Sequence, residues 1–534
     1  MKSVFRVFTV LALAATLLIT AVGPALANDA ETLPEGVFKL GQSVGYAWTN
    51  NQFRTVFGTG TDSVTKWYNI TVYLSDIADA QTAAEMDKLC KVWDPNTKTF
   101  KQSRCVLGQT NFDLQQRGID MQTSMMFGIT DRLTAGFIIP YFYSMSNASL
   151  QISNSNMGIN YMTLPDGSKV PNPQRPIGPI NCVNPNDPTT CTKNPLFPGV
   201  EHPTNAEDTN LILSSPVFGF NYQDPLGTHQ GWYLRDIILG GRYNFYNSPR
   251  WKNSFTLFII TPTGQQHNYN YLFSPANGDG NWDIGFWINN DLALNKSKTV
   301  VFNFSGGYTA QLPQTKHFRL GTVNRVAWDP TINHYDPNST AMNPLPIGAQ
   351  STSYLEMMRD IGDNVDLYLG IRWEIIPYLI LSEELYYYYK WADMYELTYQ
   401  PYACELVSQF SHDSQGAKYC GEPGADYTQA NLSTKQLSIY TDRQELVTTT
   451  ILTFSTLPFV QAGKFPLPMM VSVGYKYSIM GQNIEQSNAV FFSLDLIGHV
   501  CIFTGKCDQL GKEEEKKSAV SGNGLNYSLA NHAN

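Results

Sequence analysis

The sequence has few charged residues and, after its first 21 residues, no long apolar run. Charged residues make up 15% of the chain, whereas a typical soluble domain has roughly 25%. No later stretch approaches the about 18 consecutive apolar residues that a transmembrane helix needs. The pattern therefore disfavours both a helical membrane protein and an ordinary soluble domain.

Motifs of catalysis and of cofactor attachment are also missing. The sequence contains no G-x-S-x-G elbow, no H-E-x-x-H and no P-loop, and no C-x-x-C-H run that would attach a haem. Most of its histidines fall in expected loops, without a serine partner. We interpret His412-Asp413, between Cys404 and Cys420, as an exposed loop pair. The sequence thus predicts no enzyme, no catalytic residue, no metal site and no cofactor.

Aromatic residues, in contrast, are abundant. They make up 13% of the chain, with 30 Tyr, 28 Phe and 10 Trp, while the mean hydropathy is only −0.24. This composition suits a membrane β-barrel with a lipid-facing surface, a wet lumen and polar loops. A large secreted β-sandwich or propeller is the alternative. The net charge of −9 argues against nucleic acid as a partner.

The first residues resemble an export signal. Lys2 and Arg6 precede an apolar stretch, 7–21, and Ala25-Leu26-Ala27 offers the small-x-small pattern of a cleavage site. We therefore expect a signal peptide over 1–27, removed after Ala27. The stretch is short for a bilayer-spanning helix, and Gly23-Pro24 interrupts it.

The eight cysteines fall into four close neighbour pairs. Export would place them in a compartment that permits disulfides, and local pairing is the simplest of 105 connectivities. The expected pairs are Cys90 with Cys105, Cys182 with Cys191, Cys404 with Cys420, and Cys501 with Cys507. Their spacings do not form a paired C-x-x-C zinc site.

Several segments alternate apolar and polar residues over about ten positions, which is the signature of membrane β-strands. In 364–374, for example, Val365, Leu367 and Leu369 alternate with Asp366 and other polar residues. Short connections alternate with long ones along the chain. Strands are expected near 66–76, 117–129, 133–147, 231–247, 251–263, 280–295, 299–312, 352–374, 377–392, 435–456, 467–480 and 488–499. The prediction is an all-β, antiparallel transmembrane barrel of about twelve strands, with short periplasmic turns and long extracellular loops.

The barrel is expected to occupy 61–500, followed by a periplasmic tail, 501–534. Residues 28–60 precede it, and their weaker alternation indicates either an extra strand pair, which would give fourteen strands, or a periplasmic or plug segment. The long connection 150–228 is rich in Pro, Asn and Asp. Its length predicts a functional or mobile segment: either a constriction inside the lumen or a surface flap.

Charged residues in the polar rows are the candidates for lining the lumen, where opposite charges would orient polar solutes. Alternatively, they hydrogen-bond across a narrow, filled barrel. The lumen-lining candidates are Asp120, Asp236, Arg242, Asp283, Asp291, Asp366, Arg372, Glu374, Lys476 and Asp495. The run Tyr386 to Trp391 is interpreted as an interfacial aromatic girdle, with a slide for aromatic substrates as the alternative.

Glu383 departs from the alternation. It shares an apolar row with Leu379, Leu381 and Leu385, and a carboxylate facing lipid near the bilayer midplane is costly. A bulge or a position at the end of the strand would resolve the conflict. We therefore expect one of these two at Glu383.

Short motifs over roughly 120–310 resemble a known family. They read F-G-I-T-D-R-L-T-A-G-F-I-I-P-Y at 127–141, R-D-I-I-L-G-G-R-Y at 235–243, T-P-T-G at 261–264, G-D-G-N-W-D-I-G at 278–285 and G-G-Y at 306–308. In this order they resemble the outer-membrane β-barrel family labelled MetA-pathway of phenol degradation. The resemblance implies a transporter-like barrel in the cell outer membrane. The long disulfide-bearing loops and the tail depart from the family.

From these observations we expect an outer-membrane porin or transporter that passes small organic solutes, aromatic or hydrophobic ones included, through a polar lumen. Its partners would be outer-membrane lipid and the small-molecule solute. The alternative is a structural barrel that holds an electron-transfer cytochrome or another periplasmic or surface protein.

Overall fold

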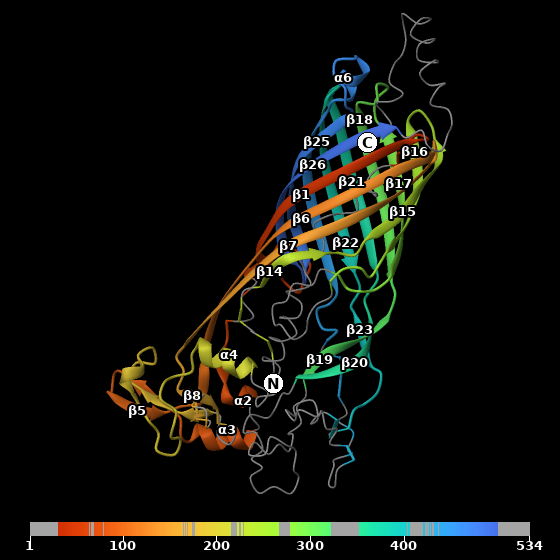
Figure 1. The fold of residues 1–534 in the computed structure, drawn as a ribbon. Helices are drawn as coiled ribbons and strands as arrows, with labels where there is room; N and C mark the ends of the chain where they lie inside the picture. Colours follow the sequence, from red (N-terminus) through yellow and green to blue (C-terminus); the bar gives the residue numbers. More distant parts are fainter. Residues whose placement is uncertain are drawn as a thin grey trace, which may run out of the picture.

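The computed structural model describes residues 30–499, apart from 66–68, 173–176, 215–221, 266–277, 322–351, 406–419, 422–426 and some further single or paired loop positions. Twelve antiparallel strands close into a barrel, which confirms the predicted fold and strand count (Figure 1). The strands are β1 (Val37–Phe53), β6 (Val106–Thr130), β7 (Leu133–Ser153), β15 (Ile238–Asn247), β16 (Trp251–Ile260), β17 (Asp283–Ala293), β18 (Val300–Gln311), β21 (Asn364–Ile376), β22 (Leu379–Lys390), β24 (Arg443–Ser455), β25 (Met469–Gln482) and β26 (Glu485–His499).

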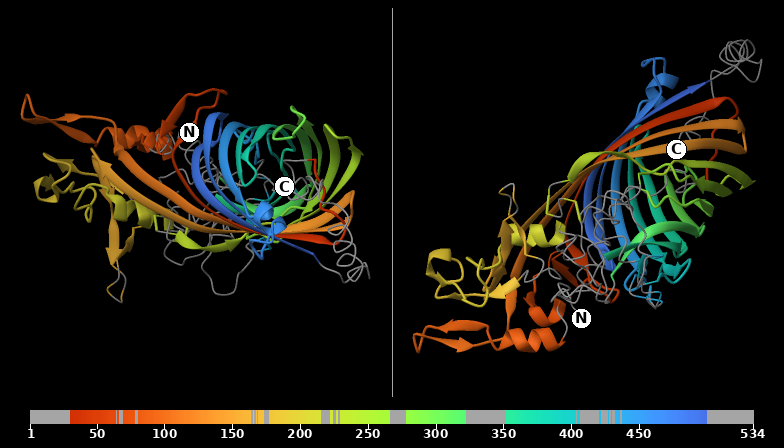
Figure 2. Two further views of the ribbon diagram at one scale, coloured as in Figure 1. Left: turned by 90° about the horizontal axis from the view of Figure 1, so that it is seen from above. Right: turned by 60° about the horizontal axis from the view of Figure 1, so that its bottom comes forward.

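Each of these strands pairs with its neighbour along the chain, and the first, β1, pairs with both β6 and the last, β26. The view from above shows the strands curving around a common axis (Figure 2). Because every edge is paired, no backbone donor or acceptor row is left open to lipid.

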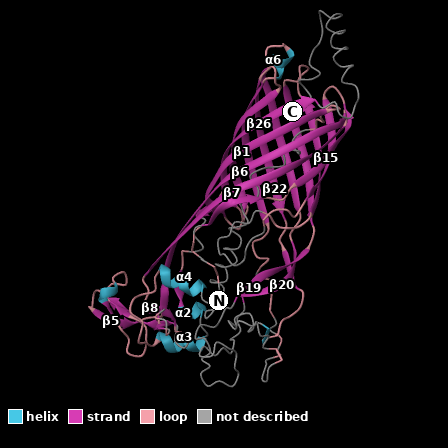
Figure 3. Cartoon of the chain, viewed as in Figure 1, coloured by secondary structure: helices cyan, strands magenta, loops and turns pink. Residues whose placement is uncertain are grey.

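The two ends of the barrel differ in their connections. Tight turns and a short helix, α6 (Leu457–Gln461), join strands at one end, while all the long connections leave from the other end (Figure 3). Short turns face the periplasm in outer-membrane barrels, so the long connections are extracellular. None of the described helices is long and apolar enough to cross a bilayer.

The outer wall of the barrel is apolar, as a lipid-facing surface requires. Leu367 and Leu369 on β21, for example, are 50% and 47% exposed, although both are large aliphatic side chains. Trp373 and Phe454 lie near the turn end, and Trp391 lies just beyond the loop end. Aromatic side chains at both rims of an apolar band are typical of the lipid interfaces. The chain is therefore an outer-membrane β-barrel.

The first strand differs from the prediction. In the described part of the expected strand 66–76, only β3 (Thr71–Tyr73) forms, and it pairs with β6 beyond the barrel. The barrel strand is β1, from the segment 28–60, which contributes one strand rather than two. After Lys39, the inward row of β1 continues with Gly41, Ser43 and Gly45, so most of its inward side chains are too small to give a clear alternation.

Two other expected strands are interrupted. Between β14 (His229–Leu234) and β15, residues 235–237 leave the sheet. The expected strand 352–374 divides into β20 (Thr352–Asp360) and β21. Strand β20 joins β19 (Gln314–Gly321) and β23 (Met394–Leu397) in a small sheet beyond the extracellular rim. Alternation continues across both breaks, which is why the sequence did not predict them.

Strands β6 and β7 run far past the rim and carry an extracellular lobe to one side of the barrel (Figures 1 and 2). Its elements are α2 (Leu74–Ile77), α3 (Ala80–Asp87), β4 (Lys91–Asp94), β5 (Thr99–Gln102), β8 (Met157–Ile159), β9 (Tyr161–Thr163), β10 (Lys169–Pro171), β11 (Ile177–Pro179), β12 (Asn181–Cys182), β13 (Cys191–Thr192) and α4 (Ala206–Ser214). The described part of 150–228 thus lies outside the lumen, which contradicts the constriction alternative.

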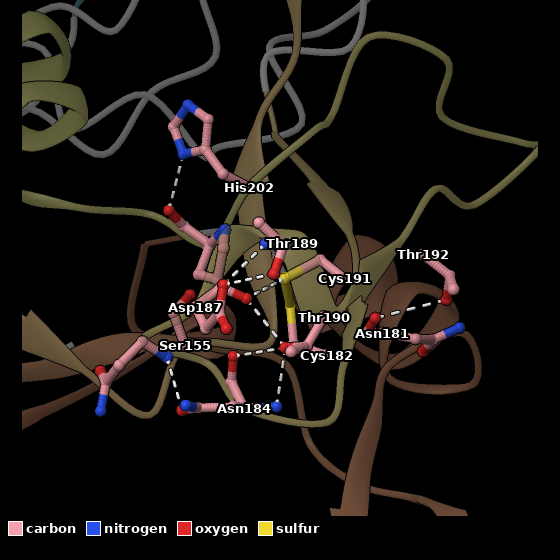
Figure 4. Close-up of a disulfide and its surroundings, with 12 residues drawn as sticks. Ser155, Asn181, Cys182, Asn184, Asp187, Thr189, Thr190, Cys191, Thr192 and His202 are labelled. Carbon is pink, nitrogen blue, oxygen red and sulfur yellow. Dashed lines mark hydrogen bonds between the residues drawn. A yellow bond between two sulfur atoms is a disulfide. The ribbon is translucent and has the colours of Figure 1, made fainter.

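Disulfides cross-link residues within the extracellular connections. The bonds Cys90–Cys105 and Cys182–Cys191 lie in the lobe, and Cys404–Cys420 lies in the connection after β23, as predicted. Around Cys182–Cys191, Asp187 accepts hydrogen bonds from the backbone and hydroxyl of Thr189 (Figure 4). The fourth expected pair, Cys501 with Cys507, lies outside the described residues.

Candidate functional site in the barrel lumen

The predicted lumen-lining residues fall on the inner face of the strands, with one exception. Their neighbours in sequence are exposed aliphatic or aromatic side chains, while most of them are buried or half-buried. This inner set is Asp120, Arg242, Asp283, Asp291, Asp366, Arg372, Glu374, Lys476 and Asp495. The exception is Asp236, which lies at the extracellular rim, in the break between β14 and β15.

An ion pair crosses part of the lumen near the extracellular end. Arg235 turns inward at the break before β15, and its Nη1 donates to Oδ2 of Asp120 on β6 over 3.2 Å. Both side chains are buried, and the guanidinium also lies 4.7 Å from the centre of the Phe142 ring. The charge of Lys476, on β25, faces Asp120 as well. Groups from three separate parts of the barrel wall therefore meet here.

Asp236 links two separate chain segments at the extracellular rim. Its two carboxylate oxygens accept the backbone amides of Gly264 and Asp279, over 2.7 and 3.2 Å. Burial and the nearby charge of Asp279 raise the pKa of Asp236 to about 7, against the effect of the two amide hydrogen bonds. Three of the family-like motifs are thereby joined at one corner of the barrel, although they are far apart in sequence.

A buried ion network also braces the extracellular rim. Asp393 accepts hydrogen bonds from Lys390 and from Arg359, the latter over 2.9 Å. Although burial acts to raise it, Arg359 and Lys390 hold the pKa of Asp393 well below its ordinary value. The network ties β22, β20 and β23 together and therefore fixes the shape of the extracellular opening.

The segment before β1 lies inside the periplasmic end of the barrel. The amide of Ala30 donates to Asp291 over 3.0 Å, and Glu31 forms a 2.6 Å ion pair with Lys252. Arg242 donates to the Glu31 carbonyl, and the amide of Leu33 donates to the Thr134 hydroxyl. The first described residues thus use inward side chains of β7, β15, β16 and β17 as partners. They occupy the periplasmic mouth.

Six aromatic side chains face inward from different strands. They are Phe142, Phe258, Trp287, Tyr368, Tyr386 and Phe491. Each lies six to nine residues from the periplasmic end of its strand. We call this set the aromatic collar.

Glycines on neighbouring strands keep these rings against the wall. Gly307 on β18 is paired with Trp287, and a Cβ there would lie 2.6 Å from the indole ring. Added Cβ atoms on Gly285 and Gly474 would clash in the same way with the rings of Phe258 and Phe491. A ring can lie over a strand glycine because no side chain stands beneath it. The collar therefore lines the lumen without its rings standing upright in it.

A cavity of about 260 Å³ lies within this part of the lumen. Its lining combines four collar rings with charged groups on facing walls: Trp287, Tyr368, Tyr386 and Phe491, together with Lys39, Asp120, Glu384, Lys476 and Asp495. Lys39 and Asp495 form a 3.1 Å ion pair across the β1–β26 seam. The site is thus aromatic on several sides and carries fixed charges of both signs.

Several residues of the site were not among the predicted lumen residues, and three of them show why. Trp287 and Glu384 occupy the inward row of their strands, so alternation alone would have found them. They were missed because Trp287 is apolar and Glu384 is adjacent to the anomalous Glu383. Arg235 was missed because its inward turn depends on a break in the sheet. Within the described segments, no group of three or more His, Cys, Asp or Glu residues is placed to hold a metal ion.

No family model and no curated protein matches the sequence, so the family resemblance of 120–310 stays a prediction. Solved structures do match. An outer membrane channel from Pseudomonas putida F1 aligns with a TM-score of 0.41 at 8% identity, covering 89% of this chain and 100% of that chain.

Two further structures align less closely. A mutant of the TodX monoaromatic hydrocarbon channel gives a TM-score of 0.30 at 7% identity over 91% of this chain and 98% of that chain. A Pseudomonas aeruginosa FadL homologue gives a TM-score of 0.27 at 7% identity, over 87% of this chain and 90% of that chain. Because all three TM-scores lie below 0.5, these similarities support no statement about what the chain transports.

Proposed function

We propose that the chain is an outer-membrane channel through which small aromatic or otherwise hydrophobic organic solutes pass. The aromatic collar carries this proposal. Four of its rings, Trp287, Tyr368, Tyr386 and Phe491, line the lumen cavity and would give a solute an aromatic wall to pack against, and the glycines beneath the rings leave space at the centre. A barrel that served only as a structural shell would have no need for such glycines beside inward rings.

The site also fits a small solute by size. An apolar cavity of about 150 Å³ accepts benzene, and the lumen cavity measures about 260 Å³. A single ring with short substituents would therefore fit between the walls. The solute class is the one that the resemblance of 120–310 also implies.

Planar-bilayer recording tests the proposal. We expect the purified chain to conduct ions, and benzyl alcohol, added on the extracellular side, to interrupt the current. Glycerol at the same concentration is the matched control, because it lacks a ring and should not interrupt it. A barrel that stays electrically silent, even after removal of residues 30–35, would overturn the proposal, as would equal effects of the two alcohols.

A further inference from the structure

Two carboxylates on one wall of the lumen have tyrosines as partners instead of cations. On β21, Asp366 accepts a hydrogen bond from the Tyr386 hydroxyl. On β22, Glu384 is hydrogen-bonded by the Tyr368 hydroxyl, whose ring lies over Gly370. Among the described residues, no lysine or arginine forms an ion pair with either carboxylate. Asp366 is buried and Glu384 is half-buried in the wall formed by β21 and β22, while the two lysines of the cavity, Lys39 and Lys476, face Asp495 and Asp120 instead.

The other lumen acids close to the cavity are compensated. Asp495 pairs with Lys39 at 3.1 Å, and Asp120 pairs with Arg235 at 3.2 Å. The barrel thus neutralises the carboxylates on the β1, β6 and β26 walls but not those on the β21–β22 wall. An ionised carboxylate without a cation is costly to bury, and either a proton or a cationic ligand would neutralise it.

Aromatic faces lie beside the uncompensated wall. Trp287, Tyr368 and Tyr386 line the same cavity as Glu384. The two tyrosine hydroxyls are engaged by carboxylates, so their rings are held in place. Trp287 and Tyr368 are 2% and 5% exposed, so a ligand would meet only the part of each ring that borders the cavity. Aromatic faces attract ammonium groups, and attraction is strongest where water is excluded.

Resting on the proposed function, we propose that this cavity binds an organic ammonium ion that carries an aromatic ring. The ammonium group would lie between Glu384 and the faces of Trp287, Tyr368 and Tyr386. Its ring would pack towards Phe491 on the far side of the cavity. The volume of about 260 Å³ suits one ring with a short ammonium-bearing chain.

Binding measured by calorimetry on the purified full chain tests this assignment. Benzylammonium, benzyl alcohol and benzoate share one ring and differ in charge. We expect benzylammonium to bind at least tenfold more tightly than the other two, which corresponds to about 1.4 kcal/mol or more. The variant Glu384→Gln keeps the shape of the side chain and should reduce the affinity for benzylammonium about tenfold, while leaving that for benzyl alcohol unchanged.

The adjacent Glu383 provides a matched control, because it has the same side chain but lies on the outer face of the same strand. Glu383→Gln should bind benzylammonium as the unmodified chain does. Equal binding of benzoate and benzylammonium, or equal losses in the two variants, would overturn the assignment. A barrel that binds benzylammonium but conducts no ions would contradict the proposed function and leave this site intact. A barrel that conducts ions but binds benzylammonium no more tightly than benzyl alcohol and benzoate would contradict this site and leave the proposed function intact.

Discussion

The backbone amide of Ala30 donates a hydrogen bond of 3.0 Å to the carboxylate of Asp291, 261 residues further along the chain. The other oxygen of Asp291 accepts a hydrogen bond from Asn303 on the next strand. The bond holds the start of the described chain against the inner wall of β17. It makes the segment before β1 part of the lumen, where it narrows the path that a solute would take.

Loosening this segment should raise the ion conductance of the barrel. The double variant Glu31→Ala, Asp291→Ala removes the ion pair with Lys252 and the acceptor for Ala30. We expect a severalfold larger single-channel conductance in planar bilayers. Glu35→Ala is the control, since that side chain is exposed in the same segment. Unchanged conductance in the double variant would show that the segment does not obstruct the path.

A side chain on Gly307 should push the Trp287 ring towards the centre of the lumen. The added Cβ of Gly307→Ala would meet the ring at 2.6 Å, and such overpacking typically costs about 1–3 kcal/mol. We expect a lower unfolding midpoint in urea and a smaller single-channel conductance.

The neighbouring Gly306 gives the control for this prediction. It faces outward, where an added Cβ would lie 3.6 Å from Leu367, an ordinary contact. Gly306→Ala should therefore change neither property. Adding Trp287→Leu to Gly307→Ala should restore much of the conductance. A loss that persists in the double variant would mean that the glycine acts through something other than the indole ring.

Alternation in the sequence was sufficient to predict most of the barrel. Strand β21 follows the predicted pattern residue by residue, because its large aliphatic side chains face lipid and its polar ones face inward. The segment that forms β1 was left open between an extra strand pair and a plug, because its inward glycines and serine weaken the contrast. Alternation describes single strands, so it contains no information about which distant groups meet. The contacts of Ala30 with Asp291 and of Arg235 with Asp120 both depend on closure of the barrel.

The titration of Asp236 should make the barrel less stable at alkaline pH. Burial raises the pKa of this carboxyl to about 7, so ionisation is less favourable in the folded state than in the unfolded chain. The resulting contribution to stability is complete below the ordinary pKa of 3.8 and is lost as the pH rises through about 7. We expect the thermal unfolding midpoint in detergent to fall between pH 5 and pH 8.5.

The variant Asp236→Asn separates this effect from other titrations. An amide keeps one acceptor for Gly264 or Asp279 but cannot ionise, so its unfolding midpoint should be lower at pH 5 and depend less on pH. The neighbouring Asp279, whose pKa is also raised by burial, remains in both proteins. Parallel pH curves for the two proteins would rule out Asp236 as a source of the dependence.

Glu383 lies on the lipid-facing side of β22 without the bulge or strand end that the sequence led us to expect. The register between β21 and β22 is continuous from Leu381 to Lys390, so that prediction was wrong. Instead, the hydroxyls of Thr448 and Thr450 on β24 donate to its two carboxylate oxygens over 2.7 and 2.6 Å. The polar group is thus satisfied by its neighbours, which is the general requirement for polar groups placed in a membrane.

Removing the two hydroxyls alone should lower the stability of the barrel more than removing the hydroxyls together with the carboxylate. Thr448→Val with Thr450→Val leaves Glu383 without donors in lipid, and an unsatisfied polar group of this kind costs about 1–3 kcal/mol or more. We expect this variant to unfold at lower urea concentration in lipid vesicles. Adding Glu383→Leu should restore most of the loss, because all three polar groups are then replaced by apolar ones. If the effects of the three substitutions on the unfolding midpoint simply add, the carboxylate and the hydroxyls do not stabilise one another. Water or lipid headgroups would then solvate Glu383 instead.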